Sequence, residues 1–239
     1  MKRNNSYIYP KTIREVIDGK RHYDINDKEK LPSVTTILSQ TQSAEKTEGL
    51  RKWRESKGEL EATRIVDESG ARGTAMHKIL EEYIKGDGYL DLTKVGKEAH
   101  NMAMKVISDG LCNVTEYYGL ESTLYYPGLY AGATDMIALH NNRMTIIDFK
   151  QSNKPKKREW IEDYCLQLAA YGMAHDYMHK TKIDKAVIMM CTPDNFYQEF
   201  VIEGEEYRQY KYKWLGRVSK YYEQKSRNRN HNEKTKQSS

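Results

Sequence analysis

The sequence predicts an α/β or α+β protein in which a mixed sheet is flanked by helices. The prediction depends on where the hydrophobic period changes. The period is mainly helical from 44 to 108, strand-like from 114 to 151 and helical again from 159 to 178, before two strands and a last helix. Of the 239 residues, 38% are hydrophobic and 31% are charged. We therefore expect one core surrounded by long, solvated helices.

The N-terminal part is expected to be mainly helical. Residues 6 to 24 are rich in tyrosine and predict a small strand pair, and "LPSVTTILSQT" predicts a short helix or strand after a proline. Residues 44 to 68 predict a highly charged helix with few apolar anchors. A second helix should begin near Ala71, where apolar residues recur at intervals of three and four, and a third should span residues 94 to 108.

The middle of the chain predicts a three-stranded meander. Its strands are "VTEYYGLESTLYYP", "LYAGATDMIALH" and "RMTIIDFKQS", and the Asn-Asn pair before the last of them predicts a tight turn. After the helix at 159 to 178, "DKAVIMMCT" and "YQEFVIE" predict two more strands. A long basic helix from about 204 to 225 should complete the fold.

Positive charge is concentrated in two places. The net charge is +5, yet residues 206 to 239 alone hold ten Lys or Arg and only three Glu. A second concentration lies at 150 to 158, where five cations occur without an acid. Basic patches favour a polyanion such as nucleic acid. A solvated flexible tail is the alternative, and we favour it for residues 226 to 239, which leaves residues 1 to 225 as a single domain.

The cysteines and the start of the chain indicate the compartment. The three cysteines lie far apart without metal-ligand spacing, so we expect neither disulfides nor an Fe–S cluster, which needs four of them. No apolar run approaches 18 residues, and "MKRNNSYIYPK" lacks the apolar segment of a secretory signal. We expect a cytoplasmic protein, in the host cytoplasm if it is phage-encoded, without a membrane partner.

A candidate site follows from "IIDFK" and the strand before it. Asp148 and Lys150 share one face of a strand, about 7 Å apart along the chain. An isolated pair of this kind is usually a surface ion pair that contributes little. Asp135 on the preceding strand can lie near both, because the tight turn pairs the two strands antiparallel.

Two carboxylates and a lysine at neighbouring strand ends suit a divalent cation. Mg²⁺ and Mn²⁺ take oxygen ligands, acidify bound water and screen the charge of a phosphate. Lys150 would then position the attacking water or stabilise the developing charge. The basic run after it would hold the backbone of a phosphodiester substrate through Lys154, Lys156, Lys157 and Arg158.

Taken in order, these motifs resemble the PD-(D/E)XK nucleases. "GATD" followed by "IIDFK" resembles the signature itself. "RGTAMHKILEEY", "DYCLQLAAY" and "LPSVTTIL" resemble its RecB-like exonuclease branch, including phage exonucleases and the mitochondrial genome maintenance exonuclease group. The resemblance spans about residues 31 to 192. It implies a restriction-endonuclease-like core, cleavage of single-stranded DNA from a free end, and a helical arch over the site, for which residues 40 to 70 are the candidate.

The resemblance also implies roles for individual residues. Asp135 and Asp148 would be metal ligands, helped by the backbone carbonyl of Phe149, and Lys150 would be the catalytic lysine. His77 would be a further ligand, although a histidine on an apolar helix is more often structural. Glu121, on the first strand of the meander, would add a carboxylate.

The remaining implied roles concern the substrate. Gln167 and Tyr171 lie at i and i+4 of one helix face and would orient the site or the DNA, unless they only pack. Gln151 stands where relatives often have Thr, which leaves the local phosphate contact in doubt. Ser152 is the candidate to make this contact in place of the Thr.

Two alternatives stay open at this point. One is a structure-specific or restriction-type endonuclease of the same fold, and the other is a nucleic-acid-binding subunit that does not cleave. Replication or recombination proteins are the expected partners.

Overall fold

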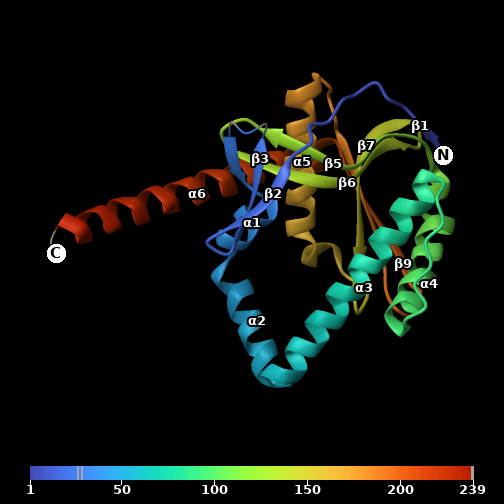
Figure 1. Cartoon of the computed structure of the whole chain (residues 1–239), viewed down its shortest axis with the longest axis horizontal. Coiled ribbons are helices and arrows are strands. Elements are labelled where there is room, and N and C mark those ends of the chain that lie inside the picture. Colours follow the sequence, from blue (N-terminus) through green and yellow to red (C-terminus); the bar gives the residue numbers. More distant parts are fainter. Residues whose placement is uncertain (26, 28, 238–239) are drawn as a thin grey trace.

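The computed structural model describes residues 1–25, 27 and 29–237, and a six-stranded mixed sheet lies at its centre (Figure 1). The strand order is β1-β5-β6-β7-β8-β9. The pairs β1–β5 and β7–β8 are parallel and the other pairs are antiparallel, so the predicted mixed sheet is confirmed. The strands are β1 (Lys2–Arg3), β5 (Val114–Tyr126), β6 (Tyr130–His140), β7 (Arg143–Gln151), β8 (Lys185–Cys191) and β9 (Tyr197–Glu203).

The turn between β6 and β7 fixes the register of the meander. Asn141 and Asn142 have φ angles of 50° and 60°, as a two-residue hairpin turn requires, and asparagine tolerates this left-handed region. The ladder then runs from His140 opposite Arg143 to Met136 opposite Ile147. The Asn-Asn turn and the meander are therefore both confirmed.

Helices cover both faces of this sheet. The structure has α1 (Val34–Gln40), α2 (Ala44–Lys57), α3 (Glu59–Lys85), α4 (Lys94–Asp109), α5 (Glu162–His179) and α6 (Gly204–Gln237), with short 3-10 turns at Leu111–Asn113 and Arg158–Trp160. On one face Ile146 and Ile188 pack with α1, α5 and α6. On the other, Ile147 and Phe149 pack with α3 and α4. Neighbouring residues of β7 thus serve opposite layers, as strand alternation requires.

A second, small sheet flanks the larger one near the N-terminus. It consists of β2 (Ile13–Ile17), β3 (Lys20–Ile25) and β4 (Glu29–Pro32) in antiparallel order. The strand pair expected at residues 6 to 24 is therefore present as β2 and β3, and β4 is added to it. The segment after Pro32 is a helix, α1, with Ser33 as its N-cap.

The helix boundaries between residues 44 and 85 differ from the prediction. The break falls at Gly58, whose φ is 77°, and α3 then continues without interruption to Lys85. No new helix begins near Ala71. Gly70 and Gly73, which suggested a break there, both lie inside α3. Close packing favours glycine at position 73, since a Cβ there would lie 3.3 Å from Cγ of Gln151. Figure 1 shows α2 and the first part of α3 projecting from the sheet as a helical hairpin.

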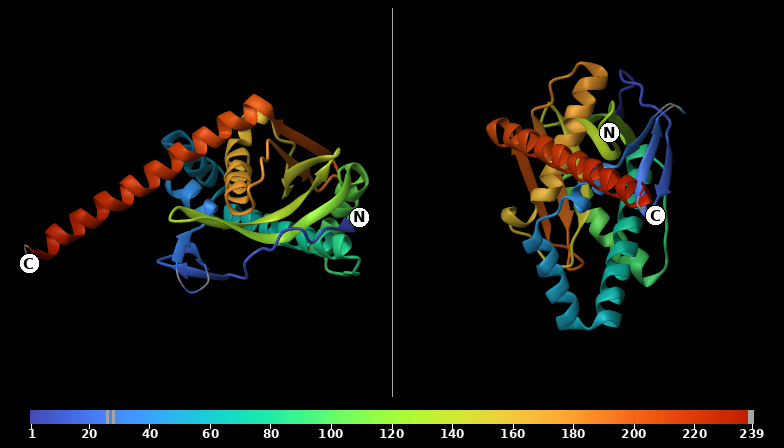
Figure 2. Two further views of the ribbon diagram at one scale, coloured as in Figure 1. Left: turned by 90° about the horizontal axis from the view of Figure 1, so that it is seen from above. Right: turned by 90° about the vertical axis from the view of Figure 1, so that its left-hand side faces the viewer.

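The last helix is longer than expected. α6 runs to Gln237, well past the predicted end near 225, because no proline or glycine interrupts residues 217 to 237. Tyr207, Trp214, Val218 and Tyr221 anchor its first part in the core, and the rest extends away from the body (Figure 2). Residues 238 and 239 of the predicted tail lie outside the described part. None of the described helices has the length and apolarity needed to cross a membrane.

Candidate metal centre

Asp148 and Lys150 form a buried ion pair at the end of β7. Nζ of Lys150 lies 2.5 Å from Oδ2 of Asp148, and Asp148 is only 1% exposed. The ammonium group also lies 5.1 Å from the ring centre of Tyr164. The two side chains therefore share a face as alternation predicts, and they are not the exposed surface pair that an isolated D-x-K usually is.

Asp135 is brought beside this pair because β6 and β7 separate there. The ladder between these strands ends at Met136 and Ile147, and from Ile146 onward β7 also pairs with β8. The backbone N–H of Phe149 donates instead to Oδ2 of Asp135, at 2.7 Å. The buried N–H of Phe149 thus keeps a hydrogen-bond partner after the ladder has ended, and the carboxylate of Asp135 is held at the point where β6 and β7 separate.

His77 approaches Asp135 from α3. Nδ1 of His77 lies 3.5 Å from Oδ1 of Asp135, and the histidine side chain is 30% exposed. Its ring stands edge-on to Phe149, with 6.2 Å between the ring centres. The structure therefore places His77 at the site, with one side open to solvent.

Glu121 completes a group of possible metal ligands. Leu120 pairs with Met136 and Ser122 with Thr134, so Glu121 stands opposite Asp135 across β5 and β6. Ligand atoms of His77, Glu121 and Asp135 all lie within 4.8 Å of one another and could hold a metal ion. Glu121 has a φ of 47°, a left-handed conformation that is unusual for a glutamate inside a strand.

The electrostatics of the site favour an added cation. Burial raises the pKa of Asp148 to about 6, the charge of Lys150 opposes that shift, and Asp135 adds to it. Burial and the neighbouring Asp135 raise the pKa of Glu121 to about 7. For Lys150, burial acts to lower the pKa, but the carboxylates of Asp148 and Asp135 outweigh it and raise the pKa. Several acids are thus crowded around one lysine.

The chemistry of these groups fits a divalent cation. Asp148 is not one of the three residues whose ligand atoms lie within 4.8 Å of one another, and its Oδ2 pairs with Nζ of Lys150 beside that group. Carboxylate oxygens, with one imidazole nitrogen beside them, are ligands that Mg²⁺ and Mn²⁺ accept. A bound cation would relieve the repulsion between the acids.

Gln167 and Tyr171 lie next to the site on α5. Nε2 of Gln167 donates to the hydroxyl of Tyr171 at 3.0 Å. Tyr171 is 2% exposed and packs so closely on β6 that a Cβ at Gly132 would lie 2.7 Å from its ring. Burial, together with the charges of Asp148 and Asp135, raises the pKa of Tyr171 well above its usual value. The two residues do pair on one helix face, and their role toward DNA stays a prediction.

The basic loop after β7 is held by contacts that the sequence did not reveal. Oγ of the buried Ser152 donates to the carbonyl of Lys154 at 2.7 Å, so this hydroxyl serves the turn. The backbone of Lys156 is bound on both sides by the amide of Gln198. Arg158 donates to both carboxylate oxygens of Glu206 and to the carbonyl of Val201, which commits its guanidinium to the fold.

The other lysines of the loop are more available. Lys154 and Lys157 are exposed, and Lys157 lies 5.3 Å from the ring centre of Trp160 and 3.9 Å from a carboxylate oxygen of Glu159. The substrate-binding role predicted for the run therefore suits Lys154 and Lys157 better than Arg158.

A buried arginine that the sequence analysis missed connects α3 to the end of β7. Nε of Arg72 donates to Gln151 at 3.1 Å, and Nη1 donates to Glu98 at 3.0 Å. Its third nitrogen donates to Asn153, and Gln151 donates in turn to Ser69. Gln151 thus helps to hold the helix that carries His77. The only signal in the sequence was an arginine beside Gly73 in "SGARGTAMH".

Comparison with known proteins agrees with the motifs. The chain is 28% identical over 225 residues to mitochondrial genome maintenance exonuclease 1 of Mus musculus. The alignment covers 86% of this chain and 65% of the mouse protein. The chain is homologous to these exonucleases. The Homo sapiens protein of the same name is 27% identical over 211 residues, covering 82% of this chain and 59% of that protein. The chain spans less than two thirds of the length of these relatives. No family model matches it.

Solved structures are less similar. The exonuclease LHK-Exo of Laribacter hongkongensis, in complex with dAMP, aligns with 14% identity and a TM-score of 0.39, over 70% of this chain and 86% of that chain. A second structure of the same alkaline exonuclease aligns with a TM-score of 0.31 and 15% identity, over 66% and 84% of the two chains. The resemblance predicted from the motifs is confirmed by the sequence relatives.

Proposed function

We propose that this chain is a metal-dependent exonuclease that hydrolyses phosphodiester bonds of single-stranded DNA from a free end. One observation carries the proposal: ligand atoms of His77, Glu121 and Asp135, from α3, β5 and β6, lie within 4.8 Å of one another, and the buried ion pair of Asp148 and Lys150 on β7 stands next to Asp135. A subunit that only binds nucleic acid has no use for carboxylates that would face phosphates. The names of the homologous proteins support exonuclease activity.

Each residue of the site has a defined task in this reaction. Asp135 and Asp148 would hold Mg²⁺ or Mn²⁺, with His77 and Glu121 beside them and the carbonyl of Phe149 as a further donor. The ion would supply positive charge next to the scissile phosphate and make a bound water more acidic. Lys150, kept protonated by its two carboxylate neighbours, would orient the attacking water and stabilise charge on the phosphate oxygens.

The hairpin of α2 and α3 is suited to guide a strand. α2 buries none of its residues, so no core contact requires this helix to stay where it is. Both helices carry exposed ion pairs along the chain, such as Arg51 with Glu48 and Arg64 with Glu61, at 2.6 and 2.8 Å. We place the single strand between this hairpin and the sheet, with Lys154 and Lys157 near its backbone. Cytoplasmic replication or recombination is the setting that we propose.

Circular single-stranded DNA should resist digestion. If the strand must pass under the hairpin, a closed circle has no end to insert, whereas a linear strand of equal composition should be degraded. The measurement is incubation of circular and end-labelled linear strands with Mg²⁺, Mn²⁺ or EDTA. Prompt nicking of the circles would favour the endonuclease alternative, and stable binding without any cleavage in either metal would favour the binding subunit.

Replacing His77 with alanine should raise the metal concentration needed for half-maximal activity by at least about tenfold. The substitution removes one ligand beside Asp135 and leaves both carboxylates in place. Activity is measured against Mn²⁺ concentration, and His100→Ala, an exposed histidine on α4, is the control. An unchanged titration in a folded His77→Ala protein would show that His77 is structural.

A further inference from the structure

An N-terminal arm, residues 4–12, crosses β5 and is fixed at both ends. The backbone N–H of Asn4 donates to the carbonyl of Tyr117 at 2.8 Å, just after the short strand β1. At the other end the hydroxyls of Thr12 and Thr123 lie 2.9 Å apart. The arm is therefore tied to β5 near Tyr117 and again near Thr123, which is about 20 Å of strand at roughly 3.3 Å per residue.

Aromatic side chains hold the middle of the arm against α5. The ring of Tyr7 lies 5.0 Å from that of His175 and 4.9 Å from that of His179. The hydroxyl of Tyr9 lies 3.1 Å from Nε2 of His175, which is buried. Tyr9 also contacts the strand closely, since a Cβ at Gly119 would lie 2.9 Å from its ring. The arm thus has a defined position without being a strand of the sheet.

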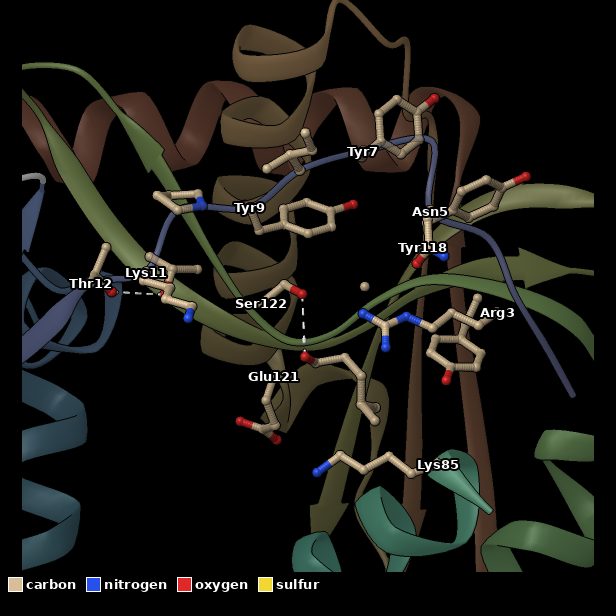
Figure 3. Close-up of a pocket in the computed structure, with 16 residues that line it drawn as sticks. Arg3, Asn5, Tyr7, Tyr9, Lys11, Thr12, Lys85, Tyr118, Glu121 and Ser122 are labelled. Atoms are coloured by element: carbon tan, nitrogen blue, oxygen red, sulfur yellow. Dashed lines mark hydrogen bonds between the residues drawn. The ribbon is translucent and has the colours of Figure 1, made fainter. Parts of the chain in front are cut away.

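A cavity of about 800 Å³ lies between this arm and β5 (Figure 3). That volume is within the range of about 300–1,000 Å³ typical of small-molecule sites. Its lining includes Arg3, Lys11 and Lys85, together with Tyr118 and Glu121 of β5. Figure 3 shows Arg3 reaching toward β5 below the arm, while the carboxylate of Glu121 points away from the arm. One side of the cavity therefore reaches Glu121, which stands opposite Asp135 in the metal centre.

The cations of the cavity differ in their availability. Lys85 is paired with Glu81 and lies 3.3 Å from Glu82, so its charge is largely balanced. Arg3 and Lys11 are exposed, and neither has a salt bridge within the part of the chain that the structure describes. Two unpaired cations beside tyrosine rings suit phosphates with bases next to them.

We propose that this cavity binds nucleotide units of the single strand next to the bond that is cleaved. Arg3 and Lys11 contact the phosphates, and the ring of Tyr118 offers a stacking surface for a base. The proposal rests on the nuclease function and adds a binding site to it. Because the arm is anchored before DNA arrives, little ordering is needed when the strand binds.

Arg3→Gln tests the site, with Lys2→Gln as a matched control. The two residues are neighbours in β1 and the substitutions change the charge equally, but the side chain of Lys2 is 82% exposed and does not line the cavity. Affinity for a fluorescent oligothymidylate is measured in EDTA, so that cleavage plays no part. We expect Arg3→Gln to weaken binding by about tenfold. The slope of log K against log salt should shrink by roughly 0.7 per lost phosphate contact.

Further variants and two competing ligands identify what the cavity binds. Lys2→Gln should bind like the wild type, Lys11→Gln should behave like Arg3→Gln, and Arg3→Lys should keep most of the affinity. The dinucleotide pTpT should compete at lower concentration than inorganic phosphate. Equal competition by the two, or equal affinities of Arg3→Gln and Lys2→Gln, would overturn the proposal.

A different result would contradict the proposed nuclease function. If the wild type neither binds the oligonucleotide nor degrades it with Mn²⁺, the proposed function itself is wrong. If the wild type does both and Arg3→Gln matches Lys2→Gln, only the cavity is misassigned.

Discussion

Replacing Lys150 with alanine is expected to lower kcat on single-stranded DNA by about 10²–10³-fold. The ammonium group lies 2.5 Å from Asp148 in a buried setting, so no other cation can take its place without rearrangement. Its charge matters most when negative charge builds up on the phosphate, which is why the loss should appear in kcat. DNA affinity should change little, because many phosphate contacts share it. Single-turnover rates and equilibrium binding, measured separately, distinguish the two effects.

Asp148→Asn should lower turnover by a similar factor for a different reason. The amide keeps the shape but removes a metal ligand charge, and DNA binding should become tighter because a carboxylate no longer repels the phosphates. Deletion of residues 226–239 is the contrasting variant, since the buried anchors of α6 up to Tyr221 remain. It should weaken binding if the tail contacts DNA and leave turnover at saturating DNA nearly normal. Loss of turnover in the deletion, with normal turnover in Lys150→Ala, would place the active site elsewhere.

Arg72→Met is expected to destabilise the fold by about 2 kcal/mol and to weaken metal binding as well. Removing one partner of a buried ion pair costs about 3–5 kcal/mol, and the effect should be smaller here because Glu98 is one third exposed. Gln151 and Asn153 would also lose a donor. The hydrogen bonds of Arg72 to Gln151, Glu98 and Asn153, here called the clamp, hold α3 against β7, so His77 should be less well placed beside Asp135. Urea unfolding gives the stability, and activity against Mn²⁺ concentration gives the effect on the site.

Arg64→Met is the control on the same helix. Among the described residues, its guanidinium pairs with Glu61 and Glu68 on the exposed surface of α3, where such pairs contribute about 0.2–1 kcal/mol. The metal titration of this variant should match the wild type. If Arg72→Met folds and titrates like Arg64→Met, the clamp does not position the site.

The sheet and the reactive pair could be predicted because local signals specify them. Alternation places Asp148 and Lys150 on one face, and the Asn-Asn turn sets the register that brings Asp135 near them. Both signals lie within about twenty residues of chain. His77 and Glu121 were suggested as ligands only through the resemblance to the nucleases, and the position of Glu121 opposite Asp135 was not predicted, since no local rule connects these elements.

The features that the sequence did not reveal depend on contacts between distant segments. The chain bends at Gly58 and not near Gly70, because Gly70 and Gly73 lie inside α3 and Gly73 packs on Gln151. The clamp at Arg72 joins residues that are 26 to 81 positions apart. The arm over β5 depends on aromatic contacts of Tyr7 and Tyr9 with His175 and His179 of α5, more than 160 positions further along the chain.

Titration of the DNA-free protein with Mn²⁺ tests the central claim most directly, because it asks whether these side chains form a metal site without relying on activity. Free Mn²⁺ is followed by its paramagnetic resonance signal. The wild type and Lys150→Ala should both remove Mn²⁺ from solution, since the lysine is not a ligand. The double substitution Asp135→Asn and Asp148→Asn should lose that binding while staying folded, because an asparagine oxygen can still accept from the N–H of Phe149. Undiminished Mn²⁺ uptake by the double variant would contradict the assignment of the site.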